Sequence, residues 1–222
     1  FYIPYRSTRG ITLSFDGEEY DVGMNVLSSK EDYLMAVDLA AAVAKLTESD
    51  IEPEDREAPL SLEQFNQDFD DEWAEGYKLA GVTAITQMVR QRGDLTMGGC
   101  LLNYHIGNDL VDQLTEGDPD EEELYQRLMK SIRRVQFISE DFVRVPNLFE
   151  VTPKEGGEPW EYIVITPDGP QLLRKTEFVI LMADQEDHLR VPFERMESYA
   201  KVNWERLDEK QYIVPDMAEE VF

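Results

Sequence analysis

The spacing of apolar residues changes near residue 136, and this change limits the fold class more than any other feature of the chain. Before it, apolar residues recur every three or four positions, as they do on one face of an α-helix. After it, short apolar runs of strand length are separated by turn residues such as Gly156 and Gly157. Helices and strands segregated in this way are typical of the α+β class. The sequence therefore predicts an α+β fold, helix-rich first and continued by a mainly antiparallel sheet.

A β-hairpin is expected to lead the helix-rich part. Residues 11–15 and 20–26 alternate apolar and polar side chains, and the turn dipeptide Asp16-Gly17 lies between them. The strands of this hairpin could also join the later sheet. A single domain over residues 1–222 is the preferred interpretation, and a subdivision into residues 1–136 and 137–222 also fits.

Two capping boxes predict the starts of the first helices. Ser28 with Glu31 and Ser61 with Gln64 have the spacing at which a hydroxyl and a longer polar side chain cap each other's main-chain amides. The first helix is expected to extend to about Leu46. A loop that contains two prolines and several acidic residues follows it.

Two longer helices are expected further along. One runs from Trp73 to about Arg92, where Gly93 ends it. Asp118 as the cap and Pro119 in the first position predict the start of the other. Residues 95–104 fit either a strand pair with a Gly-Gly bend or a loop before a short helix. The apolar stripe expected on the first of these helices comprises Trp73, Tyr77, Ala80, Ala84 and Met88.

The second part is expected to contain a central strand. Residues 178–182 form a continuous apolar run, and residues 189–191 are expected to pair with it across a turn. A short helix is expected at residues 193–201. Further strands are expected at residues 137–138, 142–143, 148–151 and 160–165.

The charge balance excludes several classes of partner. The chain has 47 acidic and 21 basic residues and a net charge of -26, whereas nucleic acids and anionic membranes bind surfaces rich in Lys and Arg. No stretch of 18 apolar residues predicts a membrane-spanning helix, and the first residues lack the apolar core of a signal peptide. One cysteine cannot form an internal disulfide or a cysteine-based zinc site, and it favours a cytoplasmic location. Two histidines argue against a multi-histidine metal centre.

The negative charge is concentrated in two segments. Residues 48–75 hold 12 acidic residues and one basic residue, Arg56, and residues 116–123 hold 6 acidic residues and no basic ones. Three interpretations fit: a solvated surface, a docking face for a basic partner, or adaptation of the protein to high salt. The densest group, Asp68 to Glu72, lacks the ligand spacing of an EF-hand, so no metal ion and no other cofactor is predicted.

No catalytic residue is predicted. Cys100 and His105 could be a thiol and its base, but their spacing is uninformative and a structural cysteine is commoner. Neither a phosphate-binding loop nor a nucleophile elbow is present. Two carboxylates acting as acid and base need no local motif, so an enzyme without a sequence signature stays an alternative.

In size and charge the chain resembles the small acidic α+β proteins that bacteria use as immunity or inhibitor partners, although no residue motif carries this resemblance. We therefore expect a non-enzymatic protein that binds a basic protein, such as a nuclease toxin, through its acidic face. A structural component of a phage or secretion system is a further alternative. The residues expected to contact the partner are Glu52, Glu54, Asp55, Glu57, Asp68, Asp70, Asp71, Glu72, Glu121 and Glu122.

Overall fold

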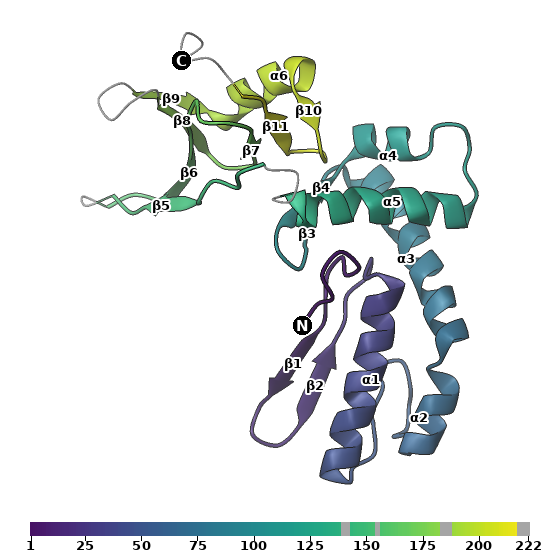
Figure 1. The fold of residues 1–222 in the computed structure, drawn as a ribbon. Coiled ribbons are helices and arrows are strands. Elements are labelled where there is room, and N and C mark those ends of the chain that lie inside the picture. The colour runs from purple at the N-terminus through teal and green to yellow at the C-terminus, as the bar shows by residue number, and fades with distance from the viewer. Residues whose placement is uncertain (139–142, 154–155, 183–187, 217–222) are drawn as a thin grey trace. The chain divides into compact units, whose positions relative to one another are not determined.

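The computed structural model describes residues 1–138, 143–153, 156–182 and 188–216 (Figure 1). The chain divides into two compact units, Phe1–Gln136 and Phe137–Phe222. Helices and small, largely antiparallel sheets occur together, and the order is a hairpin, then helices, then sheet strands. The predicted α+β class is confirmed.

The first unit begins with the predicted hairpin. Strands β1 (Thr12–Phe15) and β2 (Tyr20–Gly23) pair antiparallel, and the Asp16 carboxylate accepts hydrogen bonds from the turn amides of Glu18 and Glu19. Within the described residues, β1 and β2 form a two-stranded sheet of their own. The expectation that they could join the later sheet is therefore wrong.

Helix α1 (Lys30–Thr47) starts one residue later than the predicted capping box implies. Its N-cap is Ser29, whose capping-box partner is Asp32. The Ser28 hydroxyl accepts instead from the main-chain amide of Asn25 in the turn that precedes the helix. The predicted position of the box is wrong because contacts with the N-terminal arm bury Asp32, as described below.

Helices α2 (Leu62–Asp68) and α3 (Asp71–Arg92) follow, and the predicted capping box of Ser61 and Gln64 is confirmed. The predicted apolar stripe of α3 is wrong, because Ala80 and Ala84 are exposed. Helix α1 packs against α2 and α3, and α3 packs against α5. The face of α3 that these contacts bury therefore differs from the predicted apolar stripe. The buried residues of α3 are Ala74, Lys78, Gly81, Val82, Ile85 and Val89.

The ambiguous segment forms a strand pair, β3 (Leu95–Gly98) with β4 (Asn103–Ile106). Helix α4 (Asn108–Leu114), which was not predicted, and helix α5 (Glu121–Gln136) complete the unit.

Helix α5 starts later than predicted. Asp118 has a left-handed φ of 54°, so it and Pro119 precede the helix. The carboxylate of Asp120 caps the first turn by accepting from the amide of Glu123 at 2.8 Å.

The second unit is built on a four-stranded sheet in the order β5 (Phe149–Val151), β6 (Trp160–Ile165), β8 (Phe178–Met182) and β9 (His188–Pro192). Strands β6 and β8 run parallel, and the other neighbours run antiparallel. The expected inner position of residues 178–182 and their pairing with residues 189–191 are confirmed. The remaining elements of this unit are α6 (Phe193–Asn203), near the predicted helix, and the small sheet of β10 (Glu205–Arg206), β11 (Tyr212–Val214) and β7 (Gln171–Leu173).

Residue 137 lies in a turn and residue 138 has 3-10 helical geometry, so the strand predicted at residues 137–138 is wrong. Residue 143 does not belong to a strand either, while residue 142 and the turn at 183–187 lie outside the described residues. The core of this unit joins one face of the large sheet to α6 and the small sheet, through residues such as Ile163, Val179 and Tyr212. Among the described residues, no helix combines the length and apolar character that crossing a bilayer requires.

Candidate functional site

The loop between α1 and α2 displays the first group of predicted contact residues. The main chains of Ile51 and Leu60 exchange two hydrogen bonds, of 2.9 and 2.7 Å, which close the loop at its base. Inside it, the amide of Arg56 donates to the carbonyl of Pro53 at 3.0 Å and forms a turn. We call residues 52–59 the acidic loop, and its main chain is held by its own hydrogen bonds.

Two side chains of the acidic loop attach it to the neighbouring helices. The Tyr77 hydroxyl on α3 donates to the Asp55 carboxylate at 3.4 Å. Arg56 lies 3.6 Å from the Asp68 carboxylate at the end of α2, and its guanidinium lies over the ring of Phe69. Burial and the negative charge of Asp55 together raise the pKa of Tyr77. Asp55 and Asp68 therefore help to hold the loop against α2 and α3.

The other three carboxylates of the acidic loop have a different environment. Glu52, Glu54 and Glu57 are exposed and have no hydrogen bond or ion pair with any described residue. No lysine and only one arginine, Arg56, lies within the loop, and Arg56 points to Asp68 and Phe69. The loop thus presents three uncompensated negative charges on an ordered main chain.

The predicted residues at the start of α3 are mostly engaged within the protein. The Asp70 carboxylate caps α3 by accepting from the amides of Glu72 and Trp73, each at 3.0 Å. The Asp71 carboxylate lies 2.6 Å from the ammonium group of Lys30 at the start of α1. Of this group, Glu72 is exposed and its side chain has no partner among the described residues.

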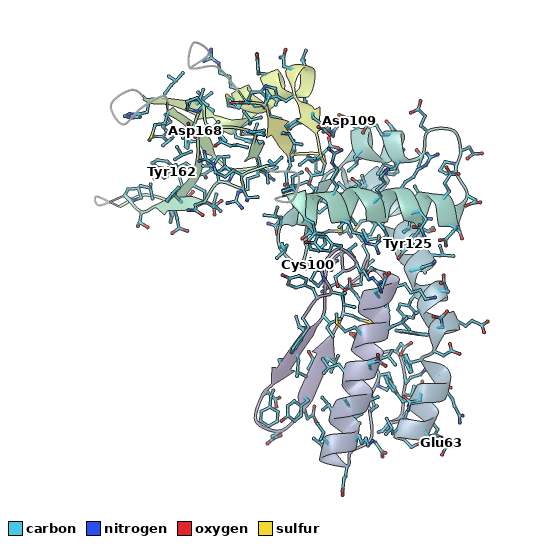
Figure 2. All side chains as sticks on the ribbon, in the orientation of Figure 1. Glu63, Cys100, Asp109, Tyr125, Tyr162 and Asp168 are labelled. Carbon is cyan, nitrogen blue, oxygen red and sulfur yellow. The ribbon has the colours of Figure 1, made fainter. Side chains whose placement is uncertain are left out.

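Two lysines connect the two acidic segments. Lys30 also lies 2.6 Å from Glu75, Glu75 in turn pairs with the buried Lys78, and Lys78 lies 3.0 Å from Glu122 on α5. We call Asp71, Lys30, Glu75, Lys78 and Glu122 the ion-pair chain. Tyr125 of α5 (Figure 2) stabilises it, because its hydroxyl accepts from the Lys30 amide and its ring lies 4.7 Å from the Lys78 ammonium.

The charges of the ion-pair chain shift one another's pKa values. Hydrogen bonds to Asp71 and Glu75 raise the pKa of Lys30. Burial lowers the pKa of Lys78, but its bonds to Glu75 and Glu122 outweigh burial and raise it overall. Lys30 and Lys78 lower the pKa of Glu75, while a hydrogen bond from Gln126 and the pairing with Lys78 lower that of Glu122. Each of these shifts favours the charged form, so Lys30, Glu75, Lys78 and Glu122 are ionised at neutral pH.

All ten predicted contact residues are exposed, and they divide into two groups according to whether the side chain has a partner. Asp55, Asp68, Asp70, Asp71 and Glu122 are bonded within the first unit. The carboxylates without a partner among the described residues are those of Glu52, Glu54, Glu57, Glu72 and Glu121.

The features considered for catalysis have structural roles. Burial raises the pKa of the Cys100 thiol to about 11, which keeps it protonated and unreactive. His105 is buried in β4 and shares a 2.9 Å hydrogen bond with Thr96 of β3. Within the described ranges, no group of three or more acidic, histidine or cysteine residues is placed to hold a metal ion.

A shallow hollow of about 330 Å³ lies between α3 and α4. It is open to solvent, and its charged residue, Arg90, pairs with Asp112 at 2.7 Å. No carboxylate lines it, so it does not supply the acid and base that the enzyme alternative needs. The lining residues are Thr86, Gln87, Arg90, Gln91, Val111 and Thr115.

Residues 1–141 match the family model described as Domain of unknown function (DUF4299). The chain belongs to the DUF4299 family. The match contains the whole first unit, and with it both acidic segments and the ion-pair chain, so these are features of the DUF4299 part of the molecule. Comparison with curated proteins found no match, and comparison with solved structures found none either.

Sequence reasoning missed the lysines of the ion-pair chain. Asp71, Glu75 and Lys78 lie four and three residues apart, which puts them on one face of α3 and is a usable signal. Their contacts to Lys30 and Glu122 join helices distant in sequence, and no local pattern indicates them.

Proposed function

We propose that this DUF4299 protein is a non-enzymatic binding protein whose acidic loop docks onto a basic protein. The observation that carries the proposal is a set of three carboxylates, Glu52, Glu54 and Glu57, that have no partner in the described part of the chain. They lie on a loop that is closed at its base and attached to two helices. Glu72 and Glu121 are proposed as further contacts.

Physical arguments support this use of the loop. Three like charges on one short loop repel each other, and a cationic partner relieves that repulsion. Because the main chain of the loop is already ordered, binding costs less conformational entropy than it would for a flexible segment. Exposed charges of this kind mainly raise the association rate and determine specificity for the partner. Both effects weaken as the salt concentration rises.

The partner class that fits best is a protein whose own function needs a basic surface, such as a nuclease toxin or another nucleic-acid-binding protein. The resemblance in size and charge to immunity and inhibitor proteins leads to the same proposal. We place the interaction in the cytoplasm, which the single cysteine favours.

The test compares two variants with the same change in net charge. E52K/E54K/E57K reverses the loop and leaves Asp55 in place, because Asp55 bonds to Tyr77. E150K/E158K/E194K reverses three exposed carboxylates of the second unit and is the matched control. The wild-type protein is first used to capture partners from host lysate at low salt, which are eluted by a salt step and identified by mass spectrometry.

Affinity for the identified partner is then measured for both variants across a range of salt concentrations. We expect the loop variant to bind about 10- to 100-fold more weakly at low salt, and the control to stay within about threefold of wild type. Equal losses in both variants would show that net charge alone drives binding. Unchanged affinity of the loop variant would remove the acidic loop as the contact.

A further inference from the structure

The large sheet of the second unit has one face that the core of this unit does not use. Ile163, Val179 and Val191 point into the core, together with residues of α6 and of the small sheet. Side chains alternate between the two faces of a strand, so the residues between them lie on the opposite face. No described helix or strand of this unit packs on that face. We call it the aromatic face, and its main residues are Phe149, Trp160, Tyr162, Phe178, Ile180 and Arg190.

Four rings form a row across the aromatic face. The strand register places Phe149 beside Tyr162. It also places Phe178 beside both Tyr162 and Pro192. Neighbouring strands are about 4.8 Å apart, so the row is about 14 Å long. The rings of Phe149 and Tyr162 stack with their centroids 5.1 Å apart, and Trp160 contacts the row at Tyr162 and Phe178. A flat apolar row of this length suits an extended segment of chain, whereas a small molecule needs a concave site.

One cation, Arg190 of β9, lies over these rings. Its guanidinium carbon is 3.6 Å from the ring centroid of Phe178 and 4.1 Å from that of Trp160. The side chain is exposed, and it makes no hydrogen bond or ion pair with any described residue. Contact with aromatic rings engages the faces of a planar guanidinium and leaves its N–H groups available for two parallel hydrogen bonds to a carboxylate. Arg190 is therefore a positioned cation whose charge is not neutralised within the described chain.

The other polar groups of the aromatic face are also able to donate hydrogen bonds. The indole N–H of Trp160 and the hydroxyl of Tyr162 (Figure 2) have no hydrogen-bond partner in the ranges that the structure describes. No aspartate or glutamate of the four strands points to this face, because Glu150 and Glu161 alternate to the other one. The chain as a whole has a net charge of -26, but this surface is positive. Charge complementarity therefore favours a ligand that carries a carboxylate among apolar groups.

We propose that the aromatic face binds an extended segment of a partner protein in which a glutamate or aspartate lies between apolar residues. The carboxylate pairs with the guanidinium of Arg190, and the apolar neighbours cover the row of rings that starts at Phe149. The surface belongs to residues 149–192, outside the part that matches the DUF4299 model, so the inference does not rest on the acidic loop. The two surfaces are opposite in charge and select different ligands.

The probe is a peptide with blocked ends and terminal serines, in which a central glutamate is flanked on each side by leucine and valine. The control peptide has glutamine in place of the glutamate. Binding is measured by fluorescence anisotropy at about 0.15 M salt, where distant carboxylates of the protein are largely screened. We expect the glutamate peptide to bind at least about tenfold more tightly than the glutamine peptide. Equal affinities, or no binding of the glutamate peptide, would overturn the proposal.

Variants of Arg190 test the pairing with the carboxylate. R190M keeps an apolar side chain on the rings, and we expect it to weaken the glutamate peptide at least about tenfold and the glutamine peptide less than about threefold. R195M removes an exposed arginine of α6 and is the matched control, which should leave both affinities within about threefold of wild type. Loss of folding would weaken both peptides alike, so the comparison separates contact from stability. Equal effects of R190M and R195M would reject the pairing.

Variants of two adjacent residues test the apolar contact. Phe149 and Leu148 are 40% and 42% exposed, but Phe149 belongs to the row of rings and Leu148 precedes β5. We expect F149A to weaken both peptides at least about fivefold and L148A to change them less than about twofold. Circular dichroism checks that each variant folds. Equal losses would show that exposed apolar area alone drives binding, which rejects the aromatic face as the site.

A further measurement tests the alternative occupant. A wild-type dimer in sedimentation that F149A dissociates would show that a second copy covers the aromatic face, and this result also rejects the proposal. Failure of the peptide to bind would leave the acidic loop untouched, because that proposal is tested with variants of the first unit and a partner captured from lysate.

Discussion

The side-chain carboxamide of Gln136 occupies the space that a side chain on Gly99 would need. Its Oε1 accepts hydrogen bonds from the amides of Leu101 and Leu102 at 2.8 and 2.9 Å, and its Nε2 donates to the carbonyl of Leu102 at 2.8 Å. The last residue of α5 thus holds the turn between β3 and β4 (Figure 2, near Cys100), and glycine at position 99 lets it come close enough.

Substitution G99A is expected to lower the free energy of unfolding by about 1–3 kcal/mol, because the new methyl group overlaps the buried carboxamide. G98A is the matched control, since a Cβ at Gly98 meets nothing within 4 Å. Urea unfolding of both variants measures the difference. Equal destabilisation by G98A would show that loss of glycine flexibility, and not the overlap, is responsible.

Asp32 is expected to be among the carboxylates most important for stability. It is fully buried, and its Oδ2 accepts from the amides of Thr8, Arg9 and Ser29 at 3.0, 3.3 and 3.1 Å. D32A leaves three amides without their acceptor, and we expect a loss of at least about 3 kcal/mol in urea unfolding. D38A, at an exposed position of the same helix, should change stability by less than about 0.5 kcal/mol. Similar losses in both variants would contradict this role.

The ion-pair chain predicts part of the acid sensitivity of the protein. Because the pKa values of Glu75 and Glu122 are lowered from 4.5 in the folded state, their stabilisation is full above that pH and is lost as the pH falls through the folded values. K78M removes one cause of both shifts, so the stability lost between pH 7 and about pH 3 should shrink. The two carboxylates are 41% and 49% exposed, so solvent screening limits the change to about 1 kcal/mol or less.

The measurement is urea unfolding at several pH values, with K45M as a control that removes an exposed lysine. K45M is expected to keep the wild-type dependence on pH. If K78M also kept it, Lys78 would not be the source of the lowered pKa values.

The single cysteine should react slowly while the protein is folded. Burial, followed by the charge of Asp32, raises the pKa of Cys100 from 9.0 to about 11, and the thiolate is the reactive form. At pH 8 this lowers the thiolate fraction by about 100-fold, so alkylation by iodoacetamide should be about that much slower than in urea. Equal rates in the folded and unfolded protein would show that the thiol is accessible and normally acidic.

Local sequence patterns correctly predicted the structural features that depend only on residues close together in the sequence. The capping box of Ser61 and Gln64 was found at its true position because its atoms lie within one turn of chain. The box at Ser28 was misplaced because the choice between Ser28 and Ser29 depends on Asp32, whose carboxylate is held by Thr8 and Arg9 of the N-terminal arm. The same limit explains the wrong stripe on α3, whose buried face is set by α1 and α5.

The sequence by itself determined the α+β class and the location of the acidic segments, because hydrophobic spacing and charge are properties of adjacent residues. Only the tertiary structure decided which carboxylates are neutralised. Asp71 and Glu122 are paired through Lys30 and Lys78 across three helices, whereas Glu52, Glu54 and Glu57 in the acidic loop have no partner among the described residues. Ion pairs act over a few ångströms in space, and which helices bring such charges together is set by the packing of the whole unit.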